Sequence, residues 1–388
     1  MAQPKDFGFA PEEQMLRDSA RKFLKDNSPI EKLRTLVARD HKSAYESDVQ
    51  PLAWDERIWR QMVDLGWTAL AVPESAGGAG MKMIAVATLA EEIGRAALPS
   101  PLIATLIATA VLARAKSDAA KAWLERIVGG DAASLAGPGA EGSWLPDATA
   151  ITATPAGDGA VLEGTAPFVQ DARKAGFFVV AARAAEEGVG LYAVPADAPG
   201  LKIHPDRIVD LTRDQARLEF DDVRVDQRAV IAAPGAGSAA VAEALPAILT
   251  IVAADLCGAA EWQLQTTAEY ARVRTQFDHQ IGFFQAVKHP IVNVMIDIDR
   301  ARSLVYAAAC AIDTEPAEAL RLARMAKAAA SDTGAFASSR SIQLHGGIGF
   351  TWECDVHIYV KRQKHNQFYF GDGAYQRAKI AALIDRAA

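Results

Sequence analysis

The stretch Gln343-Leu-His-Gly-Gly-Ile-Gly-Phe-Thr-Trp352 follows a long alanine-rich run that is typical of a helix. Three glycines, Gly346, Gly347 and Gly349, fall within four positions of it. Glycine lets the backbone come close to a ligand, and bare N–H groups beside a helix end can bind an anion such as a pyrophosphate. The same letters also fit a glycine cap followed by a tight turn. The stretch alone therefore predicts either an anion-binding loop or an ordinary helix end.

A second stretch favours the anion-binding loop. Tyr270-Ala-Arg-Val-Arg-Thr-Gln-Phe277 is followed by Ile281-Gly-Phe-Phe-Gln-Ala-Val-Lys-His289. Together the two segments resemble the acyl-CoA dehydrogenase family, whose members carry an arginine, then Gln-Phe, then Phe-Gln-x-Val-x-His. The resemblance implies that the arginine and the Gln-x-His-Gly-Gly loop hold the ADP half of FAD, commonly across a subunit interface. The chemistry fits, because a guanidinium can donate a bidentate pair of hydrogen bonds to phosphate oxygens.

The cofactor residues implied by this resemblance each have a plainer explanation. Arg274 could be a solvated helix charge, and Gln285 could be a surface amide rather than a contact of adenine or ribityl. Phe277 could belong to the core or stack on adenine, and His345 is expected to hold its loop by hydrogen bonds rather than to act as an acid or base. A basic run at 361–364 is expected to be a solvated face. The full set of predicted FAD contacts is Arg274, Gln276, Phe277, Gln285, Gln343, His345, Gly346 and Gly347.

Composition narrows the class of protein. The chain has 388 residues, enough for two or three domains. Its net charge of −7 argues against nucleic-acid binding, which needs a basic surface. We expect no membrane span and no signal peptide. Three widely spaced cysteines suggest reduced thiols in a cytoplasmic protein, and the histidine and cysteine spacing gives no support to a metal site.

The order of the segments predicts three domains. Helical periodicity marks 11–27, 54–65, 81–95 and 103–114. Gly66-Trp-Thr-Ala-Leu-Ala-Val-Pro-Glu-Ser-Ala-Gly-Gly-Ala-Gly80 is a loop by its turn residues and also resembles the signature of the family's N-terminal domain. Short runs rich in β-formers then appear, with turns about every ten residues. Four such runs are predicted as strands, namely 160–163, 176–181, 191–194 and 217–220.

From about residue 235 the chain is helical again. Pro246 is the expected start of a long helix that runs towards Arg274. Further helices are predicted over 284–313, 316–344, 355–365 and 374–388. The predicted fold is therefore α+β and multidomain, resembling acyl-CoA dehydrogenases. It has an N-terminal helical domain over 1–120, a middle antiparallel β-barrel or sandwich over 121–231, and a C-terminal four-helix bundle over 232–388.

The middle domain carries one likeness and one departure. Leu162-Glu-Gly-Thr-Ala-Pro-Phe-Val169 resembles the family segment whose end packs along the isoalloxazine ring. Family members usually also carry Thr-Glu-Pro and Gly-Ser-Asp near the start of this domain, in contact with flavin and substrate. This chain has Ala136-Gly-Pro-Gly-Ala-Glu-Gly-Ser-Trp144 instead. The flavin and thioester contacts of that loop are therefore not expected here.

The catalytic base is missing from both places where the family puts it. Desaturation of an acyl-CoA needs a carboxylate that removes the α-proton, worth about 10²–10⁴ in rate. The usual glutamate, just before the last helix, is Phe370 in this chain, and the less common position, on the first long helix of the bundle, is Ile248. Asp255, two turns further along, is the nearest other carboxylate, although a packing hydrogen bond explains it better.

Three interpretations remain open. In the first, the chain is an active dehydrogenase whose base comes from elsewhere. In the second, it is a non-catalytic FAD-binding partner subunit, since some relatives that act on steroid or dicarboxyl thioesters assemble from two chains. In the third, it is an enzyme with another flavin chemistry, such as a nitroalkane oxidase or monooxygenase. The resemblance implies FAD, an acyl-CoA substrate in fatty acid or steroid side-chain catabolism, an electron-transfer flavoprotein or similar acceptor, and a homo- or hetero-tetramer.

Overall fold

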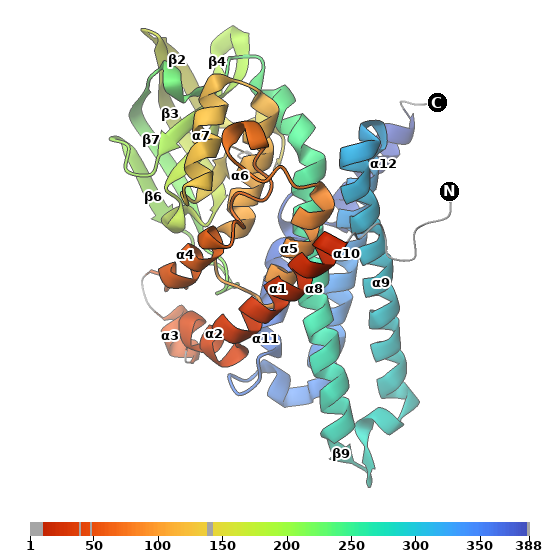
Figure 1. Cartoon of the computed structure of the whole chain (residues 1–388). Coiled ribbons are helices and arrows are strands. Elements are labelled where there is room, and N and C mark those ends of the chain that lie inside the picture. The colour runs from red at the N-terminus through yellow and green to blue at the C-terminus, as the bar shows by residue number, and fades with distance from the viewer. Residues whose placement is uncertain (1–10, 39, 47–48, 138–142, 386–388) are drawn as a thin grey trace.

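Three parts make up the fold, and the computed structural model describes residues 11–38, 40–46, 49–137 and 143–385 of them. Figure 1 shows helices in red to orange, a sheet in yellow to green, and long helices in green to blue. Helix α8 passes beside both other parts and continues to the distal end of the bundle. The predicted arrangement of helical domain, β domain and helical bundle is therefore confirmed.

The N-terminal part is helical, as its apolar periodicity predicts. Asp55 caps α4 by accepting hydrogen bonds from the backbone of Arg57 and Ile58. Gly66 follows α4 with a positive φ, which ends the helix where the sequence predicts. The helices are α1 (Pro11–Asn27), α2 (Ile30–Val37), α3 (His41–Tyr45), α4 (Glu56–Asp64), α5 (Met83–Arg95), α6 (Leu102–Ala115) and α7 (Asp118–Val128), the last of which crosses residue 120.

The middle part is an open sheet in the order β6-β7-β3-β2-β4-β5-β8, with β1 paired to β4. Most neighbours are antiparallel, but β1 runs parallel to β4, and β2 touches β4 in parallel at Thr152. The sheet does not close into a barrel, so the sandwich alternative fits better. Its strands are β1 (Ala133–Ala136), β2 (Ala150–Ala156), β3 (Gly159–Gln170), β4 (Phe177–Ala184), β5 (Gly188–Pro195), β6 (Leu201–Pro205), β7 (Gln215–Val225) and β8 (Val230–Ala232).

The C-terminal part is a bundle whose longest member is α8 (Gly237–Val273). Pro246 lies inside this helix and does not begin it, so that prediction was wrong. The missing N–H of a proline costs one internal hydrogen bond, and α8 continues because its apolar residues are packed between its neighbours on both sides of the proline. The other helices are α9 (Gln285–Thr314), α10 (Pro316–His345), α11 (Val356–Phe368) and α12 (Gly373–Asp385).

Helix α8 is apolar and long enough to cross a membrane by length and composition alone. In the fold, 78% of its most apolar window is buried. Its hydrophobic surface is covered by α5, α6, α9 and α10, so the apolar composition is that of a core helix.

Two glycines bring α5 and α8 unusually close. A Cβ atom at Gly258 would lie 1.8 Å from the backbone oxygen of Glu91, and one at Gly94 would lie 2.1 Å from that of Asp255. No side chain fits at either position without moving a backbone. The crossing therefore fixes the N-terminal part against the bundle, and it needs glycine on both helices.

Candidate functional site

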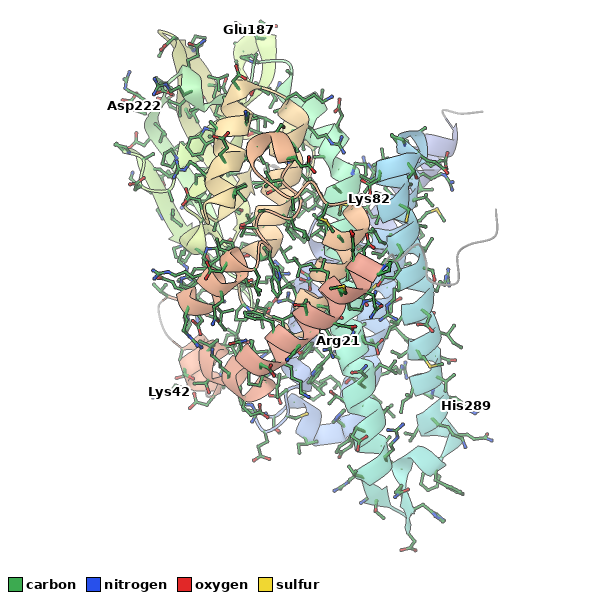
Figure 2. The ribbon with its side chains drawn as sticks, viewed as in Figure 1. Arg21, Lys42, Lys82, Glu187, Asp222 and His289 are labelled. Carbon is green, nitrogen blue, oxygen red and sulfur yellow. The ribbon has the colours of Figure 1, made fainter. Side chains whose placement is uncertain are left out.

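The predicted FAD residues gather at one end of the bundle. Helices α8 and α10 both end there, and the β9–β10 hairpin (Thr275–Gln276 with His279–Gln280) projects beyond them (Figure 1). The ring of Tyr270 in α8 stacks on His345 in α10, with centroids 4.3 Å apart. This contact joins the two segments that carry the sequence motifs. His289, the last residue of the second motif, extends outward from α9 nearby (Figure 2).

Arg274 stands at the C-cap of α8 and is exposed. Its guanidinium forms no ion pair with any residue that the structure describes, so its charge is free for a ligand. Gln276, Gln285 and Gln343 are exposed as well. The end of the bundle thus offers the unpaired guanidinium of Arg274 and several amides to an anion that approaches from outside the chain.

Phe277 forms the turn of the β9–β10 hairpin together with Asp278, and both have a positive φ, 54° and 62°. Hairpin turns of this kind favour asparagine and glycine, so a phenylalanine here is a conformational outlier. Its side chain is 84% exposed. The core alternative for Phe277 is therefore excluded, and the ring is available to stack on something outside this chain.

His345 is buried and holds the loop, as the sequence suggests. Its Nδ1 lies 2.8 Å from the carbonyl oxygen of Ser341, so Nδ1 carries the proton and donates. Burial lowers the pKa of this imidazole. A neutral ring that donates to its own helix and stacks on Tyr270 positions the glycines that follow.

The two glycines after His345 are bare and open. Gly346 has a positive φ of 67°, which a side chain would strain, whereas Gly347 has an ordinary φ. A Cβ atom at either residue would meet nothing within 4 Å. The space above this backbone is free of the chain itself. The N–H of Gly346 already donates to the carbonyl oxygens of Gln343 and Ile342. The open space over Gly347 and the unpaired guanidinium of Arg274 suit phosphate oxygens, so the residues present fit the pyrophosphate of FAD.

A separate cavity of about 500 Å³ lies where the middle domain meets the bundle. Its size suits a small-molecule ligand. None of the eight predicted FAD contacts lines it, so one chain does not bring the phosphate-binding end and this cavity together. The lining residues are Trp144, Phe168, Gln215, Lys364, His365, Phe368, Tyr369, Gly371, Asp372 and Tyr375.

The position of the usual catalytic glutamate is closed. Phe370 is 2% exposed, and its ring centroid lies 4.9 Å from that of Trp144 and 4.7 Å from that of Tyr369. Ile248, the alternative position, is fully buried in α8. Trp144 ends the segment that departs from the family pattern, and residues 138–142 of that segment lie outside the described residues. Neither position can accept a proton.

Asp255 is not a candidate base. Its carboxylate is fully buried and accepts hydrogen bonds from Arg362 at 2.6 and 2.9 Å and from Arg213 at 2.6 Å. Asn366 donates to it at 2.8 Å. Burial alone would raise the pKa of Asp255, but the two guanidiniums outweigh burial and lower it. The packing alternative is therefore correct, and Arg362, expected on a solvated face, is buried with it.

The carboxylate that does line the cavity is Asp372. It was not predicted as a base, because it does not stand at either position where the family carries its glutamate. It is half-buried, and its Oδ1 caps α12 by accepting from the backbone of Tyr375 at 2.8 Å. His365 also lines the cavity and was not predicted. The only sequence signal for either residue was its closeness to Phe370.

Three phenylalanines share an unusual backbone. Phe168, Phe277 and Phe370 have φ values of 59°, 54° and 58°. Bulky side chains rarely adopt this conformation, and such outliers cluster at functional sites. Phe168 is the residue that the resemblance places along the isoalloxazine ring, and it lines the cavity. All three fall on segments that the sequence motifs single out.

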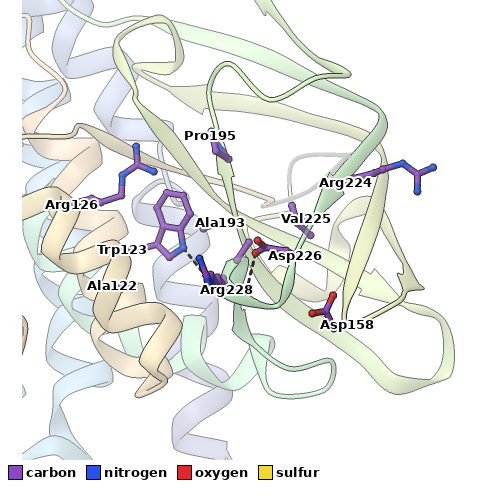
Figure 3. Close-up of a pocket in the computed structure, with 11 residues that line it drawn as sticks. Ala122, Trp123, Arg126, Asp158, Ala193, Pro195, Arg224, Val225, Asp226 and Arg228 are labelled. Atoms are coloured by element: carbon purple, nitrogen blue, oxygen red, sulfur yellow. Dashed lines mark hydrogen bonds between the residues drawn. The ribbon is translucent and has the colours of Figure 1, made fainter.

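A larger cavity, of about 640 Å³, lies elsewhere, between α7 and the sheet (Figure 3). Its walls include Trp123 and Arg126 from α7 and Arg228 from the segment after β7. Arg126 is ion-paired with Asp131 at 2.7 Å, and the indole nitrogen of Trp123 donates to the backbone of Arg228 at 3.2 Å. None of the predicted FAD contacts and neither family glutamate position lines this cavity, so its size alone does not make it the site.

Comparison with known families decides the identity. Residues 10–131 match the acyl-CoA dehydrogenase N-terminal domain, and residues 235–384 match the acyl-CoA dehydrogenase C-terminal domain. The chain is also 33% identical over 355 residues to acyl-CoA dehydrogenase IpdE2 of Mycobacterium tuberculosis, with 91% of each chain covered. The chain belongs to the acyl-CoA dehydrogenase family. FAD is the cofactor of this family, as expected.

Other acyl-CoA dehydrogenases are similar to this chain in sequence and in structure. The human mitochondrial short-chain specific acyl-CoA dehydrogenase is 28% identical, over 84% of this chain and 82% of its own. A variant of the Tcur3481–Tcur3483 steroid acyl-CoA dehydrogenase superposes with a TM-score of 0.85 at 30% identity, covering 97% and 98% of the two chains. The ChsE4–ChsE5 complex of M. tuberculosis gives 0.86 at 25% identity, covering 98% and 99%. This acyl-CoA dehydrogenase is thus an FAD-dependent oxidoreductase or one subunit of a two-chain enzyme of that kind.

Proposed function

We propose that this chain is the FAD-binding subunit of a two-chain acyl-CoA dehydrogenase, and that a second chain supplies the carboxylate that removes the α-proton. The observation that carries the proposal is the packing of Phe370 against Trp144 and Tyr369. A proton acceptor must come within hydrogen-bond reach of the proton it takes. An apolar ring sealed by two other rings cannot do so.

The distal end of the bundle supplies this chain's part of the site. Arg274 would bind the phosphates of FAD, the open backbone at Gly347 would let them come close, and Phe277 would stack on the adenine. Gln276 and Gln285 would add amide contacts. FAD, when bound, accepts the hydride from the β-carbon of the acyl group. None of these groups lines the chain's own cavity at the domain junction, so we infer that a neighbouring chain completes the site.

Two of the similar structures support a second chain, since one is a Tcur3481–Tcur3483 steroid enzyme and the other is a ChsE4–ChsE5 complex. By analogy we infer a bulky acyl-CoA, such as a steroid side-chain thioester, as substrate, and a four-chain assembly. An electron-transfer flavoprotein or similar protein would accept the electrons. Three free cysteines are consistent with the cytoplasm.

The test is flavin bleaching in the absence of oxygen. The tagged chain is expressed in its native host, and both the isolated chain and any co-purifying complex are mixed with straight-chain acyl-CoAs and a steroid side-chain acyl-CoA. We expect bleaching only by the complex. Replacing the partner's glutamate with glutamine should abolish bleaching and leave FAD bound.

Rapid bleaching by the isolated chain would overturn the proposal. Asp372 favours that second possibility, because it is a carboxylate that lines the cavity. In that case Asp372→Asn should abolish bleaching, whereas Asp372→Glu should retain part of it. If the chain is a partner subunit, Asp372→Asn leaves the bleaching rate of the complex unchanged.

A further inference from the structure

The segment 367–372 ends α11, leads into α12 and carries the phenylalanine that stands where relatives have their glutamate. Phe370 and Gly371 both have a positive φ, 58° and 88°. A phenylalanine rarely adopts this conformation, so contacts from the rest of the protein must hold it there. The same segment places Asp372 in the wall of the cavity at the domain junction. Whatever holds this backbone therefore sets the shape of that wall.

A fully buried amine holds the segment on both sides of Phe370. Lys327 in α10 is 0% exposed. Its Nζ donates to the carbonyl oxygen of Gln367 at 2.9 Å and to that of Gly371 at 2.8 Å. The third hydrogen goes to Ser331 Oγ at 2.9 Å. All three donors of the ammonium group are used, and two of them bind the backbone of the segment.

A second cation of α10 reaches the carbonyl group between these two. Arg324 lies about one turn before Lys327, and its Nη1 donates to Gln376 Oε1 at 2.8 Å. Gln376 Nε2 donates in turn to the carbonyl oxygen of Phe370 at 2.6 Å. Arg324 is 7% exposed and Gln376 is fully buried. Helix α10 thus binds the carbonyl groups of residues 367, 370 and 371.

The chemistry of the segment explains why an amine can be buried here. Lys327 forms no ion pair within the part of the chain that the structure describes, and burying a charge without a partner is costly. Gln367 belongs to the last turn of α11, where carbonyl groups lack partners within the helix and carry partial negative charge. Burial lowers the pKa of Lys327 to about 7, although Asp372 and Asp332 act in the opposite direction. The carbonyl groups therefore take the place of a counter-ion.

We infer that Lys327 is a positioning residue, which holds the segment 367–372 so that the ring of Phe370 stays against Trp144 and Asp372 keeps its place in the cavity wall. Without this amine the backbone of Phe370 relaxes from its positive φ, and the ring leaves Trp144. The inference goes beyond the two-chain proposal and does not depend on which chain supplies the base, because all of these residues belong to this chain.

Fluorine NMR of the full chain, labelled with fluorotryptophan, tests the inference. Trp144→Phe identifies the signal of Trp144 among the seven tryptophans. Lys327→Met keeps the length of the side chain and removes every donor, so the Trp144 signal should shift and broaden. The other six signals report folding and should stay in place. The matched control is Arg321→Met, which removes a cation of the same helix that pairs with Glu318 and should leave the Trp144 signal unchanged.

Lys327→Gln distinguishes positioning from the filling of space. Its amide has two donors, enough for the carbonyl groups of Gln367 and Gly371, so the Trp144 signal should return towards its wild-type position. A side chain that only fills space would give the opposite order, because burying an amide costs more than burying a thioether. A wild-type Trp144 signal in folded Lys327→Met, or a larger change in Lys327→Gln than in Lys327→Met, would overturn the inference.

Gln376→Glu keeps the test decisive if Lys327→Met does not fold. A glutamate still pairs with Arg324 but cannot donate to the carbonyl oxygen of Phe370, and Lys327 remains in place. We expect this variant to fold and to shift the Trp144 signal in the same direction by a smaller amount. A Trp144 signal identical to that of the wild type would show that the carbonyl contacts do not position the ring, which would overturn the inference as well.

Discussion

The carboxylate of Asp255 accepts two hydrogen bonds from the guanidinium of Arg362, at 2.9 Å from Nε and 2.6 Å from Nη2. Arg213, from the segment before β7, binds the same carboxylate. Arg362 also donates to Thr212 Oγ1 at 2.9 Å. The middle domain is thereby tied to α8 and α11 of the bundle by charges that are entirely buried.

Asp255→Asn should therefore destabilise the fold rather than merely remove a catalytic group. Removing one partner of a buried ion pair leaves an uncompensated charge, at a cost of about 3–5 kcal/mol. The measurement is urea unfolding. The matched control is Asp332→Asn, whose pair with Arg377 is solvent-exposed and should cost less than about 1 kcal/mol. A stable Asp255→Asn protein that no longer reacts would show that the catalytic hypothesis was correct after all.

This pair also marks what the sequence could not predict. Periodicity places Asp255 on a helix, but its partners Arg213 and Arg362 are 42 and 107 residues away in the chain. His365 and Gln170 are 195 residues apart. Contacts of this kind arise only from the fold, and no local pattern encodes them. The segments with a regular apolar period, by contrast, were predicted to within a few residues, apart from the start of α8.

The sequence motifs pointed to the predicted cofactor residues but not to the carboxylate that lines the cavity. The motifs led to Arg274, Phe277 and the loop at 343–347, and the structure places them at one end of the bundle because their segments lie at the ends of paired helices. Their contacts with FAD remain a prediction. Asp372 was missed because the family resemblance directs attention to Phe370, two residues earlier. A lining residue without a motif becomes visible only when the cavity is known.

Gly258→Ala and Gly94→Ala should both weaken the α5–α8 crossing. The added Cβ would lie about 2 Å from a backbone oxygen, so the helices must move apart. Overpacking of this kind costs about 1–3 kcal/mol and occasionally more. Thermal melting of the two variants tests this. A melting temperature equal to that of the wild type would show that the crossing is not as tight as described.

Stability should fall as the pH drops below about 6.5. Burial lowers the pKa of both His365 and His357 to about 4, compared with about 6.5 in an unfolded chain. Between these values the unfolded state binds more protons, so acid favours unfolding, and the effect ends near pH 4. The pH dependence of the urea midpoint measures it. His365→Phe should flatten the curve between pH 6.5 and 4, and an unchanged slope would contradict the assignment.

Association should depend on an apolar stripe on α9. Val292, Met295 and Ile296 lie three and four residues apart on one side of this helix, and all are exposed in the single chain. Val292→Asp should dissociate the assembly, as measured by light scattering. Val209→Asp is the matched control, because Val209 is also an exposed valine but lies on the loop between β6 and β7. If both variants keep the wild-type mass, the stripe is not the interface.

The last prediction concerns the phosphate-binding end, where Gly347 offers a variant that disturbs nothing else. Its φ is ordinary and a Cβ atom there meets nothing within 4 Å, so Gly347→Val should fold normally. The valine would nevertheless occupy the space where a phosphate approaches the backbone N–H groups, and flavin should be lost. Arg274→Ala should also yield colourless protein, because no other cation of the hairpin replaces it.

Arg272→Ala is the matched control, since this neighbouring arginine already pairs with Glu269 at 3.3 Å and is not part of the proposed contact. Flavin content is read from the visible spectrum, and folding from circular dichroism. Normal flavin in both Gly347→Val and Arg274→Ala would place the FAD phosphates elsewhere. Loss of flavin in Arg272→Ala as well would mean that general positive charge, and not the geometry of the loop, holds the cofactor.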